Sequence, residues 1–393
     1  MNLTNGDMYF KLKNKITKKY DYLSEDIKTD VVVIGGGITG AISAYYLSKK
    51  NINVVVVEKN IIGYGSTSAT TALLEYQVDI DLYKLEKMIG SNAKKIYKLC
   101  LNAVDEIESI CKEIGSEFNR VNTLYFTNSF MQKSSILKEY NARKKAKFDV
   151  KYMENNDLIN LKACIETLES SGVIDPYKFT CDLFKYLEKN NVKIYENTEI
   201  EEISSDENVY LKTTNGFNIL SSSAIFCTGF ETLKYINTNI VSLQKTFTIV
   251  SNKLDLDNIN FTARDMCDPY HYIRFDNNRI IFGGEDIKIN SKLMSEEYLE
   301  QIAKEKYNKL YIAMQKMFKI NNIEVEYMYN GTFADTIDTL PIIDEIPGLN
   351  NCFCNLGYGA NGILYSVIGA KILKEAIFGL YTKDINMFKI NRG

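Results

Sequence analysis

Residues 31–58 read VVVIGGGITGAISAYYLSKKNINVVVVE, and this stretch decides the fold. Its first four residues are apolar and mostly β-branched, as is typical of a strand that is buried on both faces. Gly35, Gly37 and Gly40 follow with the spacing G-x-G-x-x-G. In this pattern the first glycine makes a tight turn, the second lets a pyrophosphate approach the backbone, and the third lets a helix pack close to the sheet. The stretch therefore predicts a nucleotide-binding turn between a strand and a helix.

The residues after the glycine turn extend this prediction. Apolar residues recur at the spacing of one helix face, at Ile38, Ala41, Ile42 and Tyr45. Val54–Val57 then predicts a second buried strand, and Glu58 follows it directly. A carboxylate in this place can accept hydrogen bonds from the ribose hydroxyls of an adenosine. Strand, turn, helix, strand and acid together predict a dinucleotide site, whereas the glycines alone would also suit a turn without a ligand.

The composition is that of a globular protein, and the length of the chain predicts two domains. The chain has 393 residues, of which 45% are hydrophobic and 25% charged, with only 4 prolines. A formal net charge of −3 argues against a surface for nucleic acid or for anionic membranes. The basic cluster Arg143, Lys144, Lys145 and Lys147 is interpreted as a solvated helix face.

Several function classes are disfavoured by what the sequence lacks. The N-terminal residues contain no apolar signal-peptide core, and the uncharged stretch 31–47 is too short for a membrane span. The eight cysteines contain no C-x-x-C pair, so we expect free thiols in a reducing, cytoplasmic compartment. His271 is the only histidine, which argues against a histidine-rich metal site, and no metal is expected. The hard chemistry is therefore expected from a bound organic cofactor.

Periodicity and turn residues predict the remaining elements. Helices are expected over 94–114, 158–168, 178–190, 295–318 and 363–378. Strands are expected over 192–195, 209–213, 217–220, 224–227, 243–251, 270–282, 323–329 and 352–356. Asn215-Gly216 and Asn277-Asn278 are expected to form two-residue hairpin turns.

Three further segments favour a flavin over a nicotinamide dinucleotide. Residues 63–74, GYGSTSATTALL, are small and hydroxyl-bearing, so this turn can wrap a pyrophosphate and ribityl chain. The meander that ends at Thr228-Gly229 offers a close backbone approach beside the first strand. Residues 357–363, GYGANGI, form a glycine loop that opens a helix, whose positive end would favour the negative charge of a reduced flavin.

With these segments in place, the chain from about residue 29 to 378 resembles the FAD-dependent family of D-amino-acid oxidase, glycine oxidase and sarcosine oxidase. The resemblance rests on motifs in the family's order and spacing. They are VVVIGGGITG with Glu58, the GSTS turn, YENTEI, CTGFET, YIRFDNNRIIFGGED, GTFADTIDTLPIID and NLGYGANGI. These motifs specify the superfamily and say little about the substrate.

The resemblance implies where FAD would be held. Gly35, Gly37 and Gly40 would hold the pyrophosphate, and Glu58 the adenosine ribose. The remaining implied contacts are Ile38, Thr39, Lys59, Gly65, Ser66, Thr67, Thr70, Thr71, Ile200, Thr228, Gly229, Gly359, Ala360, Asn361, Gly362 and Ile363. Of these, residues 359–363 would face the pyrimidine edge of the flavin.

Three departures from the family pattern bear on the reaction. Sarcosine oxidases place two arginines after the GSTS-like turn, where this chain has Ala72 and Glu75. The segment EYMYNGTF lacks the cysteine through which some members attach FAD, so noncovalent FAD is expected. Asn361 stands where sarcosine oxidase has a lysine that helps oxygen react, so the electron acceptor, oxygen or a partner protein, stays open.

Candidate substrate-pocket residues lie on the strand that walls the pocket in this family. Alternation places Tyr270, Tyr272 and Arg274 on one face, where they could orient a polar substrate or form a structural hairpin. His271 faces the other way and is interpreted as a structural imidazole. Because an arginine is missing beside the turn, only Arg274 or, less plausibly, Arg264 could bind a carboxylate. Glu75 instead suits a second cationic group on an amine substrate.

Taken together, the fold class expected is α/β (α+β overall), with a Rossmann-like FAD-binding domain interleaved with a substrate domain on an antiparallel sheet. The FAD domain is predicted from residues 29–85, 168–236 and 331–393, and the substrate domain from 86–167 and 237–330. The predicted activity is oxidation of a C–N bond of a small amine or amino acid to the imine. The alternative is an FAD-holding subunit of an electron-transfer complex, or a flavin sensor.

Overall fold

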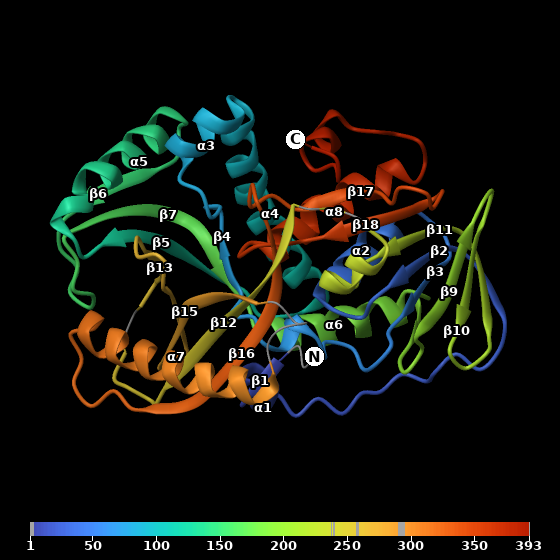
Figure 1. Ribbon diagram of the computed structural model, residues 1–393, viewed down its shortest axis with the longest axis horizontal. Coiled ribbons are helices and arrows are strands. Elements are labelled where there is room, and N and C mark those ends of the chain that lie inside the picture. Colours follow the sequence, from blue (N-terminus) through green and yellow to red (C-terminus); the bar gives the residue numbers. More distant parts are fainter. Residues whose placement is uncertain (1–3, 237, 239, 257–258, 290–294, 393) are drawn as a thin grey trace.

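The computed structural model describes residues 4–236, 238, 240–256, 259–289 and 295–392, and these form two β-sheets with helices packed on them (Figure 1). The first, here called the parallel sheet, has eight strands in the order β17-β18-β11-β2-β3-β8, with β9 and β10 attached through β11. Its strands are β2 (Ile27–Ile34), β3 (Val54–Val57), β8 (Lys193–Tyr195), β9 (Ile200–Ser205), β10 (Val209–Thr213), β11 (Asn218–Phe226), β17 (Ile342–Glu345) and β18 (Cys352–Leu356).

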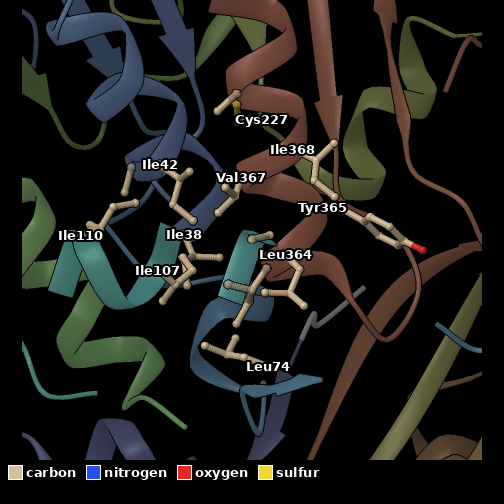
Figure 2. Close-up of a cluster of buried hydrophobic side chains, with 14 of the residues drawn as sticks. Ile38, Ile42, Leu74, Ile107, Ile110, Cys227, Leu364, Tyr365, Val367 and Ile368 are labelled. Atoms are coloured by element: carbon tan, nitrogen blue, oxygen red, sulfur yellow. The ribbon is translucent and has the colours of Figure 1, made fainter. Parts of the chain in front are cut away.

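The centre of the parallel sheet is buried on both faces, as the apolar runs predict. β18, β11, β2, β3 and β8 run parallel, and Val32, Val33 and Val56 in the central strands are fully buried. The flanking helices are α2 (Ile38–Ser48), α4 (Asn92–Ile114), α6 (Pro176–Lys189) and α8 (Gly362–Ala376). Figure 2 shows Ile38 and Ile42 of α2 meeting Ile107 of α4 and Val367 of α8 in one apolar cluster.

The second sheet, here called the large sheet, has ten strands and is mostly antiparallel. Its order is β1-β16-β12-β15-β14-β13-β5-β7-β4, with β6 paired to β7. The strands are β1 (Thr4–Gly6), β4 (Leu73–Glu75), β5 (Asn119–Thr127), β6 (Val150–Met153), β7 (Ala163–Val173), β12 (Val241–Ser251), β13 (Phe261–Asp265), β14 (Tyr272–Asp276), β15 (Arg279–Ile289) and β16 (Val325–Thr336). The helices near it are α1 (Tyr9–Lys13), α3 (Leu82–Ile89), α5 (Lys133–Lys145) and α7 (Glu296–Met317). Buried Leu310 and Met314 of α7 pack against Phe282 of β15.

Two secondary-structure predictions are wrong, one for a helix and one for a pair of strands. Residues 158–168 were expected to be helical, but Ala163–Val173 form β7, which pairs with β4, β5 and β6. A short apolar run of this kind is compatible with a helix or a strand, and here pairing with distant strands selects the strand. Residues 217–220 and 224–227 were expected as separate strands, yet Asn218–Phe226 is one strand, because β10 pairs with its first half and β18 with its second.

Two local predictions also need correction. The backbone N–H of Thr213 donates to the carbonyl oxygen of Phe217 across three loop residues, and Gly216 has φ +86°. This hairpin therefore has a type I turn followed by a bulge, instead of the predicted two-residue turn. Arg143 is fully buried instead of lying on a solvated face. Its Nε donates to Oε1 of Glu139 at 2.7 Å, and the same carboxylate accepts the backbone N–H of Leu82 at the start of α3. The Asn277-Asn278 turn is confirmed, because both residues have positive φ and Asp276 pairs with Arg279.

The two sheets draw on alternating parts of the chain, and the predicted domain boundaries can be placed on them. The segments 31–34 and 352–356 lie in the same sheet, joined through β11. The boundaries predicted at 168 and 331 fall inside β7 and β16, and residue 237 lies outside the described residues. The division into two domains stays a prediction. In the described ranges, no helix combines the length and the apolarity that crossing a membrane requires.

Candidate functional site

One cavity runs from the carboxyl ends of the parallel strands to the large sheet. We call its two parts the glycine end, lined by the turn after β2, Glu58, Ile200 and Thr228, and the tyrosine end. The tyrosine end is lined by Glu75, Gln77, Thr246, Arg264, Tyr270, Tyr272 and Asp286. In open α/β sheets, ligands bind at this edge, where strand connections leave in opposite directions.

The glycine turn fits closely between strand and helix. Gly35 has φ +117°, and a Cβ there would lie 2.5 Å from the carbonyl oxygen of Cys227. A Cβ at Gly40 would lie 1.9 Å from the carbonyl oxygen of Gly35, so only glycine allows α2 to begin this near β2. The first turn of α2 lines the cavity, and the N–H of Ile38 donates to Oγ1 of Thr67 at 3.0 Å. Backbone donors and the positive helix end thus face the cavity.

Glu58 closes the glycine end at the carboxyl end of β3. Its Oε2 accepts the N–H of Gly36 at 2.7 Å, and its Oε1 accepts the N–H of Asn60 at 2.8 Å. Burial raises the pKa of Glu58, and these two hydrogen bonds oppose the shift. Each carboxylate oxygen keeps further acceptor capacity, so the side chain can still receive hydroxyl donors from a ligand.

The segment 65–72 and the loop before α8 form the walls between the two ends. Oγ of Ser66 donates to the carbonyl oxygen of Thr332 at 2.8 Å, which ties the first wall to β16. A Cβ at Gly357 would lie 2.2 Å from the carbonyl oxygen of Gly362, and Gly359 has φ +75°, so the second wall also needs glycine. Both walls present mainly backbone and small side chains, which leaves room for a flat, extended ligand.

The sequence-predicted cofactor residues converge on this cavity. All of them except Gly40 line it; Gly40 lies behind the turn against Gly35. The residues that line it are Gly35, Gly37, Ile38, Thr39, Glu58, Lys59, Gly65, Ser66, Thr67, Thr70, Thr71, Ile200, Thr228, Gly229, Gly359, Ala360, Asn361, Gly362 and Ile363.

At the tyrosine end, three of the four predicted substrate-pocket residues line the cavity, namely Tyr270, Tyr272 and Glu75. The rings of Tyr270 and Tyr272 meet edge to face with centroids 6.5 Å apart. Tyr272 shares a hydrogen bond of 2.7 Å with the hydroxyl of Thr246, and the hydroxyl of Tyr270 donates to Oδ1 of Asp79 at 2.9 Å. Glu75 is 5% exposed and accepts a hydrogen bond from Thr262 at 2.8 Å, so its carboxylate faces the protein interior and not bulk solvent.

Arg274 and His271 do not belong to the cavity lining. Nη1 of Arg274 donates to the carbonyl oxygens of Thr71 at 2.5 Å and Ile174 at 2.8 Å, so it holds backbone segments together. Regular pairing of β14 with β15 keeps Arg274 on the face of Tyr272. It does not line the pocket, because its long side chain reaches carbonyl groups that need a donor, and these contacts fit the alternative of a structural hairpin. His271 pairs through Nδ1 with Oδ2 of Asp265 at 2.7 Å and stacks on Phe282.

Arg264, considered the less plausible arginine, is the one that lines the cavity. It is 6% exposed, and its Nη1 donates to Oδ1 of Asp79 at 3.2 Å. Burial would lower its pKa, but Tyr270, Tyr125 and the carboxylates of Asp79 and Glu75 raise it, so the side chain stays charged. Within the described residues, Asp265, Cys267 and His271 are near enough to suggest metal ligands. Hydrogen bonds from the backbone N–H groups of Cys267 and His271 to Asp265 account for this cluster as a folded loop.

Sequence reasoning missed Gln77, Asp79 and Asp286. Glu75, Gln77 and Asp79 alternate along the chain directly after the GSTS turn, a period-two pattern that could have placed all three at one wall. Asp286 gave no such signal, because a local irregularity in β15 determines its direction. Burial, together with the nearby Asp79 and Asp335, raises the pKa of Asp286 to about 7, although a hydrogen bond from Thr246 opposes the shift.

Buried polar atoms at this cavity point to a ligand. Among the described residues, several cavity-lining side chains have a buried polar atom without a hydrogen-bond partner. These atoms are both amide atoms of Gln77, Nε of Arg264, Oδ1 of Asp286, Oγ1 of Thr332 and Oδ1 of Asn355. The glycine cradle with backbone donors at one end, and the unpaired Thr332 and Asn355 along the cavity, fit a dinucleotide with a polar ring system, as FAD has.

Known proteins share this fold. The crystal structure of glycine oxidase from Geobacillus kaustophilus superposes with a TM-score of 0.78 at 18% identity, over 93% of this chain and 99% of that one. L-Amino acid deaminase from Proteus vulgaris superposes with a TM-score of 0.78 at 14% identity, over 96% of this chain and 100% of the other. At these identities the likeness establishes the fold.

Some sequence relatives match this chain over most of their length, and others over less than half of it. Gamma-glutamylputrescine oxidoreductase of Escherichia coli is 20% identical over 92% of this chain and 86% of that protein. Glycerol 3-phosphate dehydrogenase of Caloramator mitchellensis is 27% identical, but over 55% of this chain and 44% of that protein. A Bacillus subtilis relative, named for a Rieske 2Fe-2S iron-sulfur protein, is 28% identical, and the match covers only 42% of its length. The chain thus spans less than half the length of these last two relatives.

A family model described as FAD dependent oxidoreductase matches residues 30–376, which include the glycine turn, Glu58, both walls of the cavity and the tyrosine end. The fit of the cavity to a dinucleotide agrees with this match, and FAD is the cofactor of the family. The chain belongs to the FAD dependent oxidoreductase family.

Proposed function

We propose that this protein is an enzyme that oxidises a C–N bond of a small amine to the imine, with FAD as the electron acceptor. The observation that carries the proposal is the charge of the tyrosine end. Glu75 and Asp286 line it, whereas the one arginine among the described lining residues, Arg264, is already paired with Asp79. A wall of this kind suits a cationic amine and offers no free guanidinium to a carboxylate.

The cofactor-contact residues inferred from the sequence are part of this proposal. Gly35 and Gly37 would hold the pyrophosphate, Glu58 the adenosine ribose, and residues 359–363 the pyrimidine edge of the ring. FAD bound there supplies a two-electron acceptor for a hydride equivalent. The protein's own task is to place the substrate's C–H group, exclude water and hold the reacting amine in its neutral form when the hydride leaves.

Noncovalent attachment of FAD is also proposed. Cys227 is the one cysteine among the described lining residues, and its Sγ lies 3.5 Å from Oγ of Ser43. Burial raises the pKa of the Cys227 thiol to about 12, which makes it a poor nucleophile. The FAD should therefore be released by denaturation. All eight cysteines lie in the described part of the chain as free thiols, which supports the inferred reducing, cytoplasmic compartment.

The names of relatives support an amine substrate but do not identify which amine it is. Gamma-glutamylputrescine oxidoreductase and the glycine oxidase of Bacillus subtilis, which is 22% identical over 92% of this chain, are both named for compounds that contain an amine. Of these two chemistries, the missing arginine and the buried Glu75 favour an amine without an α-carboxylate, such as a diamine whose second ammonium meets Glu75.

The test is a substrate panel read through the flavin. Purified protein should be yellow, and anaerobic addition of a competent amine should bleach the flavin absorbance. The panel should contain monoamines, diamines, glycine, sarcosine and D-amino acids at equal concentration. Failure to bind any FAD after reconstitution would sink the proposal, and efficient reduction by amino acids alone would overturn the preference for an amine without a carboxylate.

A second candidate function is an FAD-holding subunit of an electron-transfer complex. The Rieske-named relative and Asn361, at the position where sarcosine oxidase has a lysine, favour an acceptor other than oxygen. The discriminating measurement is reoxidation of substrate-reduced flavin. Reoxidation by dissolved oxygen within seconds indicates an oxidase, whereas reoxidation only by an added acceptor indicates a dehydrogenase or complex subunit. A flavin sensor would bind FAD and show no reduction by any amine.

A further inference from the structure

An irregularity in β15 directs Asp286 into the cavity. In a regular strand, alternate residues face the same side, so Phe282 and Asp286 would share a face, and Phe282 packs toward α7. The pairing of β12 with β15 shifts register between Lys245 and Phe247, opposite residues 284–287, and Glu285 has φ +56°. This bulge turns Glu285 toward α7, where it accepts a hydrogen bond from Lys306 at 2.8 Å, and leaves Asp286 to line the cavity.

The surroundings of Asp286 lack a protein cation in direct contact. Oδ1 of Asp286 is buried and has no hydrogen-bond partner among the described residues. The facing groups on the packed elements are Thr246 of β12, Tyr270 and Tyr272 at β14, Asp79 after β4, and Asp335 of β16. Lys306 of α7 acts on Asp286 electrostatically, but its ammonium is bound to Glu285. Arg264 lines the same end, and its charge is shared between Asp79 and Glu75. Asp286 and Asp335 therefore have no directly paired cation among the described residues.

An independent observation points to a ligand beside these carboxylates. Gln77 lines the same cavity and is only 1% exposed, yet neither its Nε2 nor its Oε1 has a partner among the described residues. A buried amide without partners costs free energy that a bound polar molecule would recover. The tyrosine end therefore has the character of a preformed site for a small, polar, cationic molecule.

We propose that Asp286 binds the substrate's ammonium group at the tyrosine end and accepts its proton before C–N oxidation. This inference rests on the proposed function and adds the residue that performs the recognition. In the step, one N–H bond of R-CH2-NH3+ breaks and an O–H bond forms on the Asp286 carboxylate, which leaves neutral R-CH2-NH2 and a neutral carboxylic acid. The nitrogen lone pair is then free to form the C=N bond when the hydride leaves.

The recognition step can be tested without turnover. Tetramethylammonium has no lone pair on nitrogen and cannot be oxidised to an imine, so its dissociation constant reports the cation site alone. We expect the wild-type FAD-loaded protein to bind it about tenfold more tightly at pH 8 than at pH 6, as Asp286 loses its proton. Asp286→Asn should weaken binding at pH 8 by about ten- to hundredfold and remove the pH dependence.

Glu166→Gln is the matched control, because this carboxylate on β7 accepts a hydrogen bond from Asn122 at 2.8 Å and lies outside the cavity lining. It should bind tetramethylammonium as the wild type does. The proton-transfer step is tested by anaerobic flavin reduction with the best amine. The wild-type rate should rise through pH 7, whereas Asp286→Asn should reduce the flavin about a hundredfold more slowly at pH 7.

The outcomes separate the two proposals. If the wild type binds tetramethylammonium equally at pH 6 and pH 8, or if Asp286→Asn binds it unchanged, the assignment of Asp286 is overturned, whether or not amines reduce the flavin. If the cation binds as expected and no amine bleaches the flavin, the cation site stands and the proposed oxidation is wrong. Burial and Asp79 also raise the pKa of Asp335, to about 6, so the wild-type pH dependence is compared with that of a variant. If Asp286→Asn fails to fold, Asp286→Ser takes its place in the same measurement.

Discussion

The guanidinium of Arg264 donates from Nη1 to Oδ1 of Asp79 over 3.2 Å, and the ring of Tyr270 lies 4.7 Å from the same guanidinium. The arginine at the cavity is thus held by a carboxylate and an aromatic face of its own chain. A substrate carboxylate that reached the unpaired Nε of Arg264 would have to share this one cation with Asp79, which is held at Nη1. This pairing separates the site from one built to bind α-amino acids through a free arginine.

The first prediction concerns this ion pair. Arg264→Met should lower the free energy of unfolding by about 3–5 kcal/mol, because Asp79 and Glu75 lose the neighbouring positive charge. The double variant with Asp79→Asn should recover part of the loss, and urea unfolding of the single and double variants measures the coupling. If Arg264→Met is as stable as wild type but loses reduction by amino acids, the arginine serves a substrate carboxylate instead.

Substitutions in the glycine turn should separate folding from FAD binding. Gly40→Ala places a Cβ 1.9 Å from the carbonyl oxygen of Gly35, so we expect a loss of about 3 kcal/mol of stability and loss of bound FAD. Gly37→Ala meets only Oγ1 of Thr67, at 3.2 Å, so the apoprotein should fold normally and bind FAD more weakly. Thermal unfolding of apoprotein and flavin content after purification measure the two effects. Equal stability of the two variants would contradict this account.

Arg274 is expected to act on structure and not on substrate. Arg274→Lys keeps the charge but cannot reproduce the contacts of one guanidinium with the carbonyl oxygens of Thr71, Ala72 and Ile174. We expect a loss of about 2–3 kcal/mol of stability, with the KM for the best amine nearly unchanged. A selective rise in KM for an amino acid, without a loss of stability, would restore Arg274 as a substrate-binding residue.

The sequence was sufficient for the cofactor half of the site because local patterns determine it. The glycine turn, Glu58 and the loop at 357–363 each lie within a few residues of a buried parallel strand, so their places follow from the strand order. The residues that line the cavity include all but one of the predicted cofactor contacts, and the exception, Gly40, is required for helix packing.

The tyrosine end was less predictable because long-range pairing and backbone irregularities determine it. Simple alternation placed Arg274 with the tyrosines, but its guanidinium reaches carbonyl groups of two other segments. The direction of Asp286 depends on a bulge whose position is visible only once β12 and β15 are paired. On such strands the sequence indicates which residue types are available for a site. It does not predict which groups each side chain reaches, because strand pairing and bulges determine that.

Glu75 is expected to bind the second cationic group of a diamine. Glu75→Gln should raise the KM for such a diamine by about tenfold with little change in kcat, because it removes an attraction present in both ground state and transition state. The KM for a monoamine should stay near the wild-type value. The matched control is Glu166→Gln on β7, which lies outside the cavity lining and bonds Asn122. Equal changes for diamine and monoamine would show that Glu75 acts through structure alone.

The last prediction follows from the cost of ionising Asp286 in the folded protein. Its pKa is raised by burial and by Asp79 and Asp335 to about 7, whereas an aspartate in the unfolded chain titrates near its usual value of about 4. Between these values the folded state binds more protons than the unfolded state, so this group lowers stability as pH rises from about 4 to 7.

Asp286→Asn removes that ionisation, so the variant should equal the wild type in stability near pH 4 and exceed it above pH 7. The expected gain at pH 8 is about 1–3 kcal/mol, discounted because the side chain is partly exposed to the cavity. Urea unfolding of the flavin-free protein at several pH values measures it, with Glu166→Gln, outside the cavity lining, as the control. A gain that is independent of pH would show that Asp286 ionises in the folded protein as it does in the unfolded chain, and that its carboxylate is solvated instead of being buried beside an empty cation site.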